Sequence, residues 1–378
     1  MIKEMYKLFM GGMMILALSC KGTNSDVSES KDILLEVDNV GEGLLLSEEF
    51  TDVEIIPLEN NPKAILSDVR KMIVTDRGMY FWDNGPKPQV LFFGHDGTFR
   101  NSIGSMGHAK GEYQMIMSIA STSSGDTVAI VKYPNADLFD GGGKFLSTFE
   151  IRDDVGTEDL LMADEGIYVG YYHRQKESIV SLHSWETDGV VDIVRTSNDP
   201  IRHPLSQDNG NSLQQDGDKV YCLDIFGSAI YSIDRTNPSD VVKYSLGMDG
   251  ILTEDIARNA ANDDDLDGYF HISSYNVCNG VVRGCIERNA DSFESYDFKF
   301  STAGGNVSLM RHADMGYLFD CCHSGYFYRI VSAGRILDYM GRKDMDGVRN
   351  LLGDKLNELS GKVSPSDNHY VLKMRPRE

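Results

Sequence analysis

The chain has 378 residues and a formal net charge of −22 at neutral pH, with 41% hydrophobic and 25% charged residues. This composition predicts a folded core. It excludes a nucleic-acid-binding protein, because phosphate contacts require a basic surface. The acidity fits either plain solubility in a crowded compartment or a surface for a cation or a basic partner.

A targeting segment precedes the folded part of the chain. Two lysines are followed by an apolar run over residues 8–18 and then by Cys20. The run is too short for a membrane-spanning helix and is typical of a signal peptide. The small residues before Cys20 resemble a bacterial lipobox, which implies cleavage before Cys20 and its acylation; an ordinary signal peptide with an incidental cysteine is the alternative. We predict a signal peptide over 1–19, lipidated Cys20 with a flexible tether over 20–49, and one domain over 50–378.

Short strands dominate the first part of the domain. After an N-terminal strand over residues 50–58, the sequence predicts strands over 70–75, 78–83, 89–93 and 98–103. Four successive strands joined by tight turns form one blade of a β-propeller.

The same pattern recurs along the chain, with turns about 44 to 55 residues apart. These turns lie at Asp96-Gly97, Asp140-Gly141, Asp188-Gly189, Asp234-Arg235, Arg288-Asn289 and Ala333-Gly334. This period is typical of propeller blades. The sequence therefore predicts an all-β, six-bladed β-propeller whose ring is closed by residues 51–58 or 369–374.

In the last two repeats the pattern predicts second strands over residues 269–277 and 316–321. Hairpins of third and fourth strands are predicted to follow over 281–300 and 326–339.

Two segments depart from the strand pattern. Residues 253–261 predict a short helix in which Thr253 is the N-cap. Residues 346–359 carry an apolar stripe at helical spacing, and Gly361 follows as a stop signal. The second segment is the helical insertion that we expect near the C-terminus.

A resemblance to a known group rests on four motifs. The lipobox, the strand over residues 53–59, the segment over 92–97 and the glycine-rich loop over 104–113 resemble the six-bladed β-propeller lipoproteins of Bacteroidetes. The group's loop pattern is close to Gly-x-x-Gly-x-Gly-Pro-Gly-Glu-Tyr, and Ala109-Lys110 here replaces its Gly-Pro pair. The resemblance implies NHL-like repeats, a cell-envelope protein of the outer membrane, and a largely unknown function associated with nutrient handling.

The end of this loop, Gly111-Glu112-Tyr113, is a candidate ligand contact at one rim of the central channel. The alternative is a structural turn, in which the glycine permits a positive φ angle and the tyrosine packs between blades.

An acidic stretch contains the start of a calcium loop. Asp263, Asp265 and Asp267 precede Gly268 at the spacing that calcium loops use, but Ser274 stands where a bidentate glutamate is expected. The residues leave open a weak calcium site or a solvated acidic insertion.

Five cysteines follow Cys20, so complete pairing within the chain is impossible. Cys278 and Cys285 could face each other across a hairpin, although their spacing cannot show it. His312, Cys321, Cys322 and His323 are metal-ligand residue types, but successive strand residues point to opposite faces, which disfavours a shared site.

No nucleophile elbow, phosphate loop or zinc-protease helix occurs in the sequence. We expect a non-catalytic scaffold that needs no cofactor, is held to the membrane by its lipid, and binds a glycan, a peptide or an envelope protein. The alternative is a calcium-dependent propeller hydrolase or lyase with its site in the central channel. Carboxylate, Asn and His side chains that converge on the channel would support the alternative.

Overall fold

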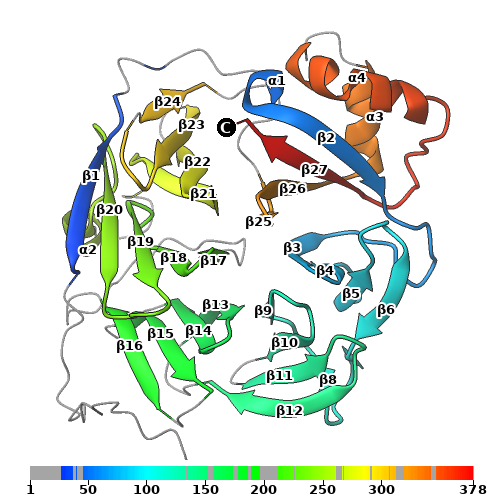
Figure 1. Cartoon of the computed structure of the whole chain (residues 1–378), viewed down its shortest axis with the longest axis horizontal. Coiled ribbons are helices and arrows are strands. Elements are labelled where there is room, and N and C mark those ends of the chain that lie inside the picture. Colours follow the sequence, from blue (N-terminus) through cyan, green and yellow to red (C-terminus); the bar gives the residue numbers. More distant parts are fainter. Residues whose placement is uncertain are drawn as a thin grey trace, which may run out of the picture.

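The computed structural model describes residues 27–36, 40, 46–132, 135–151, 156–172, 178–185, 189–195, 212–224, 226–260, 266, 268–289, 292–305, 307–311, 319–341 and 346–377. Six sheets surround a central axis (Figure 1). Their innermost strands contact one another in a closed ring, in the order β3, β9, β13, β17, β21 and β25. The structure confirms the predicted six-bladed β-propeller.

The first four blades run from the innermost strand outward in chain order. They are β3 (Val69–Thr75), β4 (Gly78–Asp83), β5 (Gln89–Phe93) and β6 (Phe99–Ile103); β9 (Ser118–Ser121), β10 (Thr127–Lys132), β11 (Asn135–Asp140) and β12 (Phe145–Glu150); β13 (Gly156–Met162), β14 (Gly166–Tyr172), β15 (Ser178–Ser184) and β16 (Val190–Arg195); and β17 (Leu213–Asp216), β18 (Lys219–Leu223), β19 (Ala229–Asp234) and β20 (Val241–Gly247). Every innermost strand therefore runs toward the same end of the channel.

The fifth blade follows the same order, whereas the sixth is built differently. The fifth contains β21 (His271–Cys278), β22 (Val281–Asn289), β23 (Phe293–Ser301) and β24 (Ser308–Met310). The sixth contains β25 (Cys321–His323), β26 (Tyr326–Val331), β27 (Tyr370–Pro376) and, outermost, β2 (Phe50–Pro57). Val53 of β2 lies opposite Met374 of β27. Strands from both ends of the chain thus close the ring in one blade.

The predicted strand order of these two blades was wrong by one position. Residues 269–277 contain β21, which is an innermost strand, and the hairpin over 281–300 holds the second and third strands. Cys321 likewise begins an innermost strand. The predicted hairpin over 326–339 is β26 followed by α3 (Ala333–Gly341). The reason is that β27 and β2 already fill the outer positions of the sixth blade.

Helices pack beside the closing blade. Helix α3 is capped at Ser332, whose Oγ accepts a hydrogen bond from the backbone N of Arg335 at 3.2 Å. It lies with α1 (Leu46–Glu49) and α4 (Asp346–Leu359) near β2 in Figure 1. Helix α2 (Glu254–Asn259) begins after Thr253, the predicted N-cap. Within the described ranges, none of the helices is long and apolar enough to cross a membrane.

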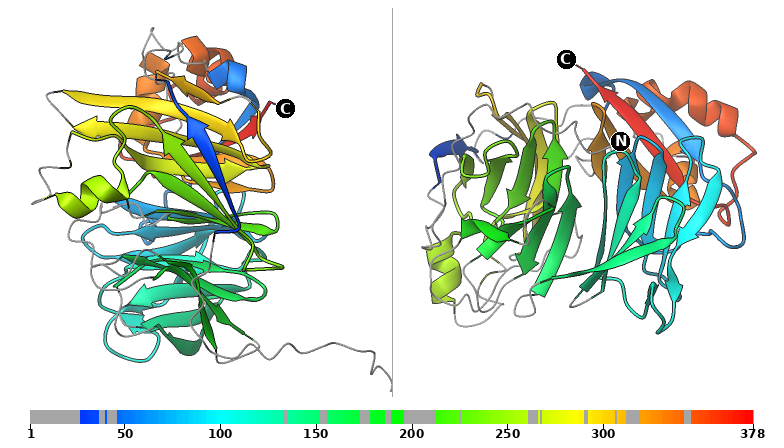
Figure 2. Two further views of the ribbon diagram at one scale, coloured as in Figure 1. Left: turned by 90° about the vertical axis from the view of Figure 1, so that its left-hand side faces the viewer. Right: turned by 60° about the horizontal axis from the view of Figure 1, so that its bottom comes forward.

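The expected flexible tether over residues 20–49 is wrong for two segments. Residues 46–49 form α1, and Glu29–Leu34 forms β1, which pairs in parallel with β20 on the outer edge of the fourth blade (Figure 2). Ile33 and Leu35 are buried there. The open edge of β20 explains the docking, because it offers backbone groups that need partners.

The apolar core is divided among the seams, by which we mean the interfaces between neighbouring blades. One buried cluster fills each of the six seams, and a seventh, smaller cluster surrounds α2. The seams therefore hold the blades in a fixed ring around the channel.

Candidate functional site

A pocket of about 550 Å³ opens at the end of the channel toward which the innermost strands run. All six blades contribute to its lining, for example through Lys71, Ser121, Leu160, Asp216, Asn279 and His323. Its volume lies in the range of small-molecule sites. A site built from single residues of six separate strands leaves no local motif, which explains why the sequence did not reveal it.

Polar and aliphatic groups share the lining of the pocket. Hydroxyl, amide and carboxylate side chains come from the strand ends and turns, whereas Ile73, Leu160 and Leu213 supply aliphatic wall. No Phe, Tyr or Trp occurs among the described lining residues. The pocket can therefore offer hydrogen bonds and aliphatic contact, but not ring stacking.

An ion pair crosses the channel at the floor of the pocket. Lys71 in β3 contacts Asp159 in β13, and the two side chains are only 6% and 0% exposed. These strands are not neighbours, because β9 lies between them in the ring. The two side chains therefore meet across the channel, which they close below the pocket.

Asp159 is saturated with hydrogen-bond donors. Its Oδ1 accepts from Ser118 Oγ at 2.9 Å and from the backbone N of Leu160 at 2.8 Å, while Oδ2 accepts from the backbone N of Leu213 at 3.1 Å. Burial raises the pKa of Asp159, and Lys71 and these donors act in the opposite direction. This network ties four blades together, so it is a structural floor.

A histidine and an aspartate face each other at the rim. His323 Nε2 lies 3.2 Å from Asp76 Oδ1, and their side chains are 16% and 68% exposed. Burial lowers the pKa of His323, while the Asp76 carboxylate opposes that shift. The pair joins the sixth blade to the first and presents one exposed carboxylate to the pocket.

Asp216 makes the corresponding connection between the fourth and fifth blades. Its two oxygens accept hydrogen bonds from the backbone N of Asn279 at 3.1 Å and of Gly280 at 2.6 Å. Both of these residues have positive φ angles, 52° and 71°, as a tight turn requires. The turn is thereby fixed at the rim of the pocket.

Asp320 lies deeper, at the start of the sixth blade. Its Oδ2 accepts a hydrogen bond from the backbone N of Ile330 at 2.7 Å. Burial raises its pKa to about 6. Burial also raises the pKa of the neighbouring Cys321 thiol, so the pocket wall disfavours the charged forms of both groups.

A disulfide lies in the same wall and answers the question of cysteine pairing that the sequence left open. Cys278 bonds to Cys322, with a Cα–Cα distance of 5.8 Å, and so links the fifth and sixth blades. Cys285 cannot pair with Cys278, because Cys278 lies opposite Val281 and Cys285 lies opposite Ser274. Cys222, Cys285 and Cys321 form no disulfide. The partner of Cys278 depends on the ring, which sequence spacing does not show.

The loop that was predicted as a ligand contact lies away from this pocket. Gly111 has a φ of 78°, Glu112 Oε2 accepts from the backbone N of Ala109 at 2.8 Å, and Tyr113 is 3% exposed. β7 (Ser105–Met106) and β8 (Glu112–Tyr113) pair within it. These contacts are those of a structural turn, and a ligand role for Gly111, Glu112 and Tyr113 stays a prediction.

The other predicted sites lie outside the described residues. These are Cys20, His312 and the calcium candidates Asp263, Asp265 and Asp267. Within the described part of the chain, no three His, Cys, Asp or Glu side chains are grouped so that they could hold a metal ion.

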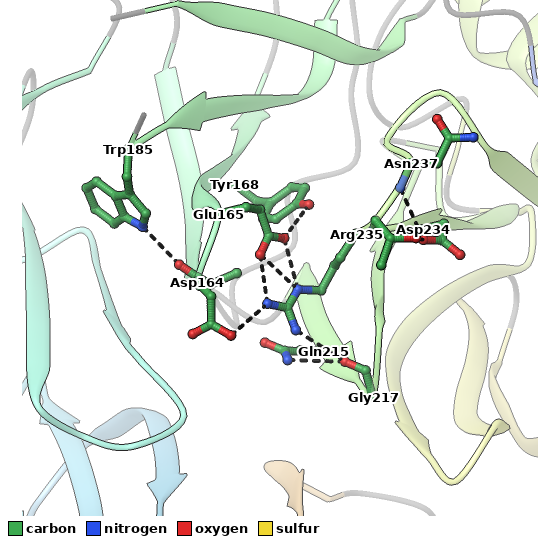
Figure 3. A network of polar contacts seen from close by, with 11 residues as sticks. Asp164, Glu165, Tyr168, Trp185, Gln215, Gly217, Asp234, Arg235 and Asn237 are labelled. Atoms are coloured by element: carbon green, nitrogen blue, oxygen red, sulfur yellow. Dashed lines mark hydrogen bonds and ion pairs between the residues drawn. The ribbon is translucent and has the colours of Figure 1, made fainter. Parts of the chain in front are cut away.

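A second polar network joins the third and fourth blades on the pocket side (Figure 3). Arg235 donates to Glu165 through Nη2 at 2.7 Å and Nε at 2.9 Å, and Tyr168 donates to the same carboxylate at 2.8 Å. Trp185 Nε1 donates to the carbonyl of Ala163 at 2.9 Å. The network places an exposed tryptophan on the same face as the pocket.

Fold and site together define a six-bladed propeller with a ligand-sized pocket at one mouth of its channel. Residues 32–375 match the family described as "Domain of unknown function (DUF4934)", and the chain belongs to that family. No curated protein matches the chain.

Two solved structures share the fold at low sequence identity. A protein of Bacteroides fragilis described as exported has 15% identity and a TM-score of 0.71, covering 92% of this chain and 100% of its own. A DUF4221 member from Bacteroides vulgatus has 8% identity and a TM-score of 0.52, covering 87% and 98%. These likenesses concern the fold alone.

Proposed function

We propose that this protein is a non-catalytic binding protein of the cell envelope, and that the pocket at the mouth of the channel holds its ligand. The observation that carries the proposal is the pocket itself, to which all six blades contribute and whose floor is sealed by Lys71 and Asp159. A rigid, preformed concavity of this size is what a small-ligand site requires.

The rim chemistry favours a short peptide or another ligand that carries an amine. Asp76 and Asp216 place carboxylates on the lining, and the hydroxyl groups of Thr122, Ser123 and Ser324 add hydrogen-bonding partners. Carboxylates bind ammonium and guanidinium groups well. A glycan is the less favoured ligand, because sugar rings gain affinity by stacking on aromatic side chains, which the described lining lacks.

The charged groups of the pocket are suited to a fixed scaffold. Lys71 is engaged by Asp159, both oxygens of Asp216 accept backbone hydrogen bonds, and His323 faces Asp76. Each partner holds its neighbour in place, which favours recognition of a constant ligand shape over proton transfer.

An envelope location agrees with three features. Cys20 follows a lipobox-like segment, the disulfide between Cys278 and Cys322 suits an oxidising compartment, and the B. fragilis neighbour is described as exported. In this proposal Cys20 carries the lipid that holds the propeller to the outer membrane.

The test is thermal unfolding of the full chain in detergent, with short basic peptides, neutral peptides, oligosaccharides, and calcium against chelator. A ligand at 100 times its Kd should stabilise the fold by about 3 kcal/mol and raise the midpoint. We expect the rise with basic peptides. A rise with calcium alone would replace this proposal with the calcium-dependent hydrolase or lyase.

A matched pair of variants locates the binding. Asp76→Asn removes a rim carboxylate whose side chain is 68% exposed, and should weaken peptide binding without unfolding the ring. Asp126→Asn removes a carboxylate that is 73% exposed and does not line the pocket. Equal loss of binding in both variants would contradict a site at the mouth.

A further inference from the structure

The start of β1 fixes where the N-terminal segment meets the propeller. Ser28 Oγ donates to Asp240 Oδ1 at 2.7 Å, so the chain joins the fourth blade at the turn between β19 and β20. That turn adjoins the one between β17 and β18, because the backbone N of Arg235 donates to the carbonyl of Asp218 at 2.9 Å. Asp216 and Gly217 of the latter turn line the pocket. The N-terminal segment thus arrives on the pocket side of the ring.

Residues that pair across the sheet of the fourth blade give the distance from the pocket lining to Ser28. Asp216 lies opposite Lys219, which lies opposite Asp234, and the next two strands are β20 and β1. Four strand spacings of ~4.8 Å make ~20 Å from the pocket lining to Ser28.

The chain between the predicted lipid and the propeller is short. Seven residues lie between Cys20 and Ser28, and the eight Cα–Cα steps of this segment span at most ~28 Å when fully extended. The seven residues of β20 measure ~23 Å. If the opposite end of the blade faced the bilayer, the segment between Cys20 and Ser28 would have to extend along the whole of β20, which would use most of its reach.

An apolar patch lies beside this attachment point. The patch consists of Trp185, just after the end of β15, and Val190, at the start of β16, which are 44% and 41% exposed. Trp185 packs over the Asp164–Glu165 turn, and Arg235 of the fourth blade binds the other side of that turn (Figure 3). Exposed apolar patches mark contact surfaces, and tryptophan is favoured at the boundary between lipid and water.

We infer that the pocket face of the propeller is turned toward the membrane that holds Cys20, with the patch of Trp185 and Val190 at the lipid surface. The inference rests on the lipid anchor proposed above. Its consequence is that ligands enter the pocket from the narrow space beside the membrane. The acidic chain would make this contact with zwitterionic lipid, because an anionic surface repels it.

The two tryptophans of the chain make the test direct. Trp82 is 8% exposed, so Trp82→Phe leaves Trp185 as the sole reporter on the pocket side. The matched control is the triple variant Trp82→Phe/Trp185→Phe/Phe293→Trp. Position 293 is 65% exposed and begins β23, opposite Asn289. Asn289 is the last residue of β22, a strand of nine residues that begins beside the pocket turn at Gly280.

The full lipidated variants are reconstituted in phosphatidylcholine–phosphatidylethanolamine vesicles that contain headgroup-nitroxide lipid. Trp185 fluorescence should be quenched at least threefold more than that of the Trp at position 293. A twenty-residue Gly-Ser insertion between Asp26 and Val27 should reduce the difference. Equal quenching, or stronger quenching at position 293, would overturn the inference and point to a protein partner for the patch.

Intact mass measurement of the mature chain separates this inference from the proposed function. Acylated Cys20 is expected, and an unmodified N-terminus would refute the anchor and the orientation together. Peptide binding to the pocket in detergent does not depend on the lipid, so the proposed binding function would still stand after that result.

Discussion

The seams between the first and second blades and between the fifth and sixth blades hold the same ring by different means. The first is packed with apolar and aromatic side chains, among them Tyr80 and Phe92, whose rings stack at 4.4 Å. The second adds the disulfide between Cys278 and Cys322 to its apolar cluster, and the adjoining α1 carries Glu49, which binds Arg283 of the fifth blade.

The difference follows from the order of the chain. The first two blades are each built from one continuous stretch of chain, and side-chain packing suffices between them. The sixth blade includes β2, which is far in sequence from β25, so this blade is complete only when the two ends of the chain meet. The covalent and ionic links therefore lie beside the blade that is assembled from both ends of the chain.

Removing the disulfide should have the largest effect. Cys278→Ala with Cys322→Ala opens a link over 44 residues, for which loop-closure entropy predicts a loss of about 4 kcal/mol in the free energy of unfolding. Urea denaturation measures it. Reductant should bring the unsubstituted chain to the midpoint of the variant and leave the variant unchanged. A variant as stable as the parent would show that this seam, like the first, is held by packing alone.

Glu49→Gln should cause the second-largest loss in the free energy of unfolding. Glu49 is 5% exposed and accepts from Lys299 Nζ at 2.8 Å as well as from Arg283, which is 4% exposed. Leaving that guanidinium buried without its counter-charge should lower the free energy of unfolding by about 3 kcal/mol. Glu54→Gln is the control, because its pair with Lys373 lies on the surface of β2, the strand that follows α1. Equal effects of the two changes would contradict a special role for α1.

The same contrast shows what sequence can reveal. The early blades follow a regular strand and turn pattern, so their strands and hairpins were predicted close to their observed bounds. The last two blades were predicted one strand out of place, and in the sixth blade this is because its outer strands come from 370–376 and 50–57. That exchange depends on ring closure, which leaves no mark on local periodicity.

The pocket was missed for a related reason. Lys71 and Asp159 are charged residues inside otherwise strand-like segments, and that anomaly was the available signal. Their pairing across β9 follows only from the ring. The motif that was visible, Gly111-Glu112-Tyr113, forms a local turn, since a contiguous motif more readily specifies a turn than a site assembled from six strands.

Tyr80→Phe tests the first seam with a smaller expected effect. The hydroxyl donates to the carbonyl of Gly125 at 3.0 Å across the two blades, and this bond is buried. Its loss should lower the free energy of unfolding by about 1 kcal/mol, while the stacking on Phe92 is kept. The effect should be independent of reductant. A loss that appears only in reduced protein would mean that the two seams are coupled through the ring.

The smallest predicted effect depends on pH and is confined to the sixth blade. Burial raises the pKa of Asp320 from 3.8 to about 6, so the folded chain holds this proton more tightly than the unfolded chain does. The stability that protonated Asp320 contributes is complete below pH ~4 and is lost as the pH rises to ~6. The free energy of unfolding of Asp320→Asn should therefore match that of the parent at pH ~4 and exceed it by about 1 kcal/mol above pH ~6. This difference is smaller than the full pKa shift implies, because the side chain is partly exposed. Urea titrations across this range measure the difference, with Tyr80→Phe as the control whose deficit should stay constant. A constant difference for Asp320→Asn as well would show that this carboxyl titrates alike in the folded and unfolded chains, and that the pH dependence of the ring arises elsewhere than beside its closing seam.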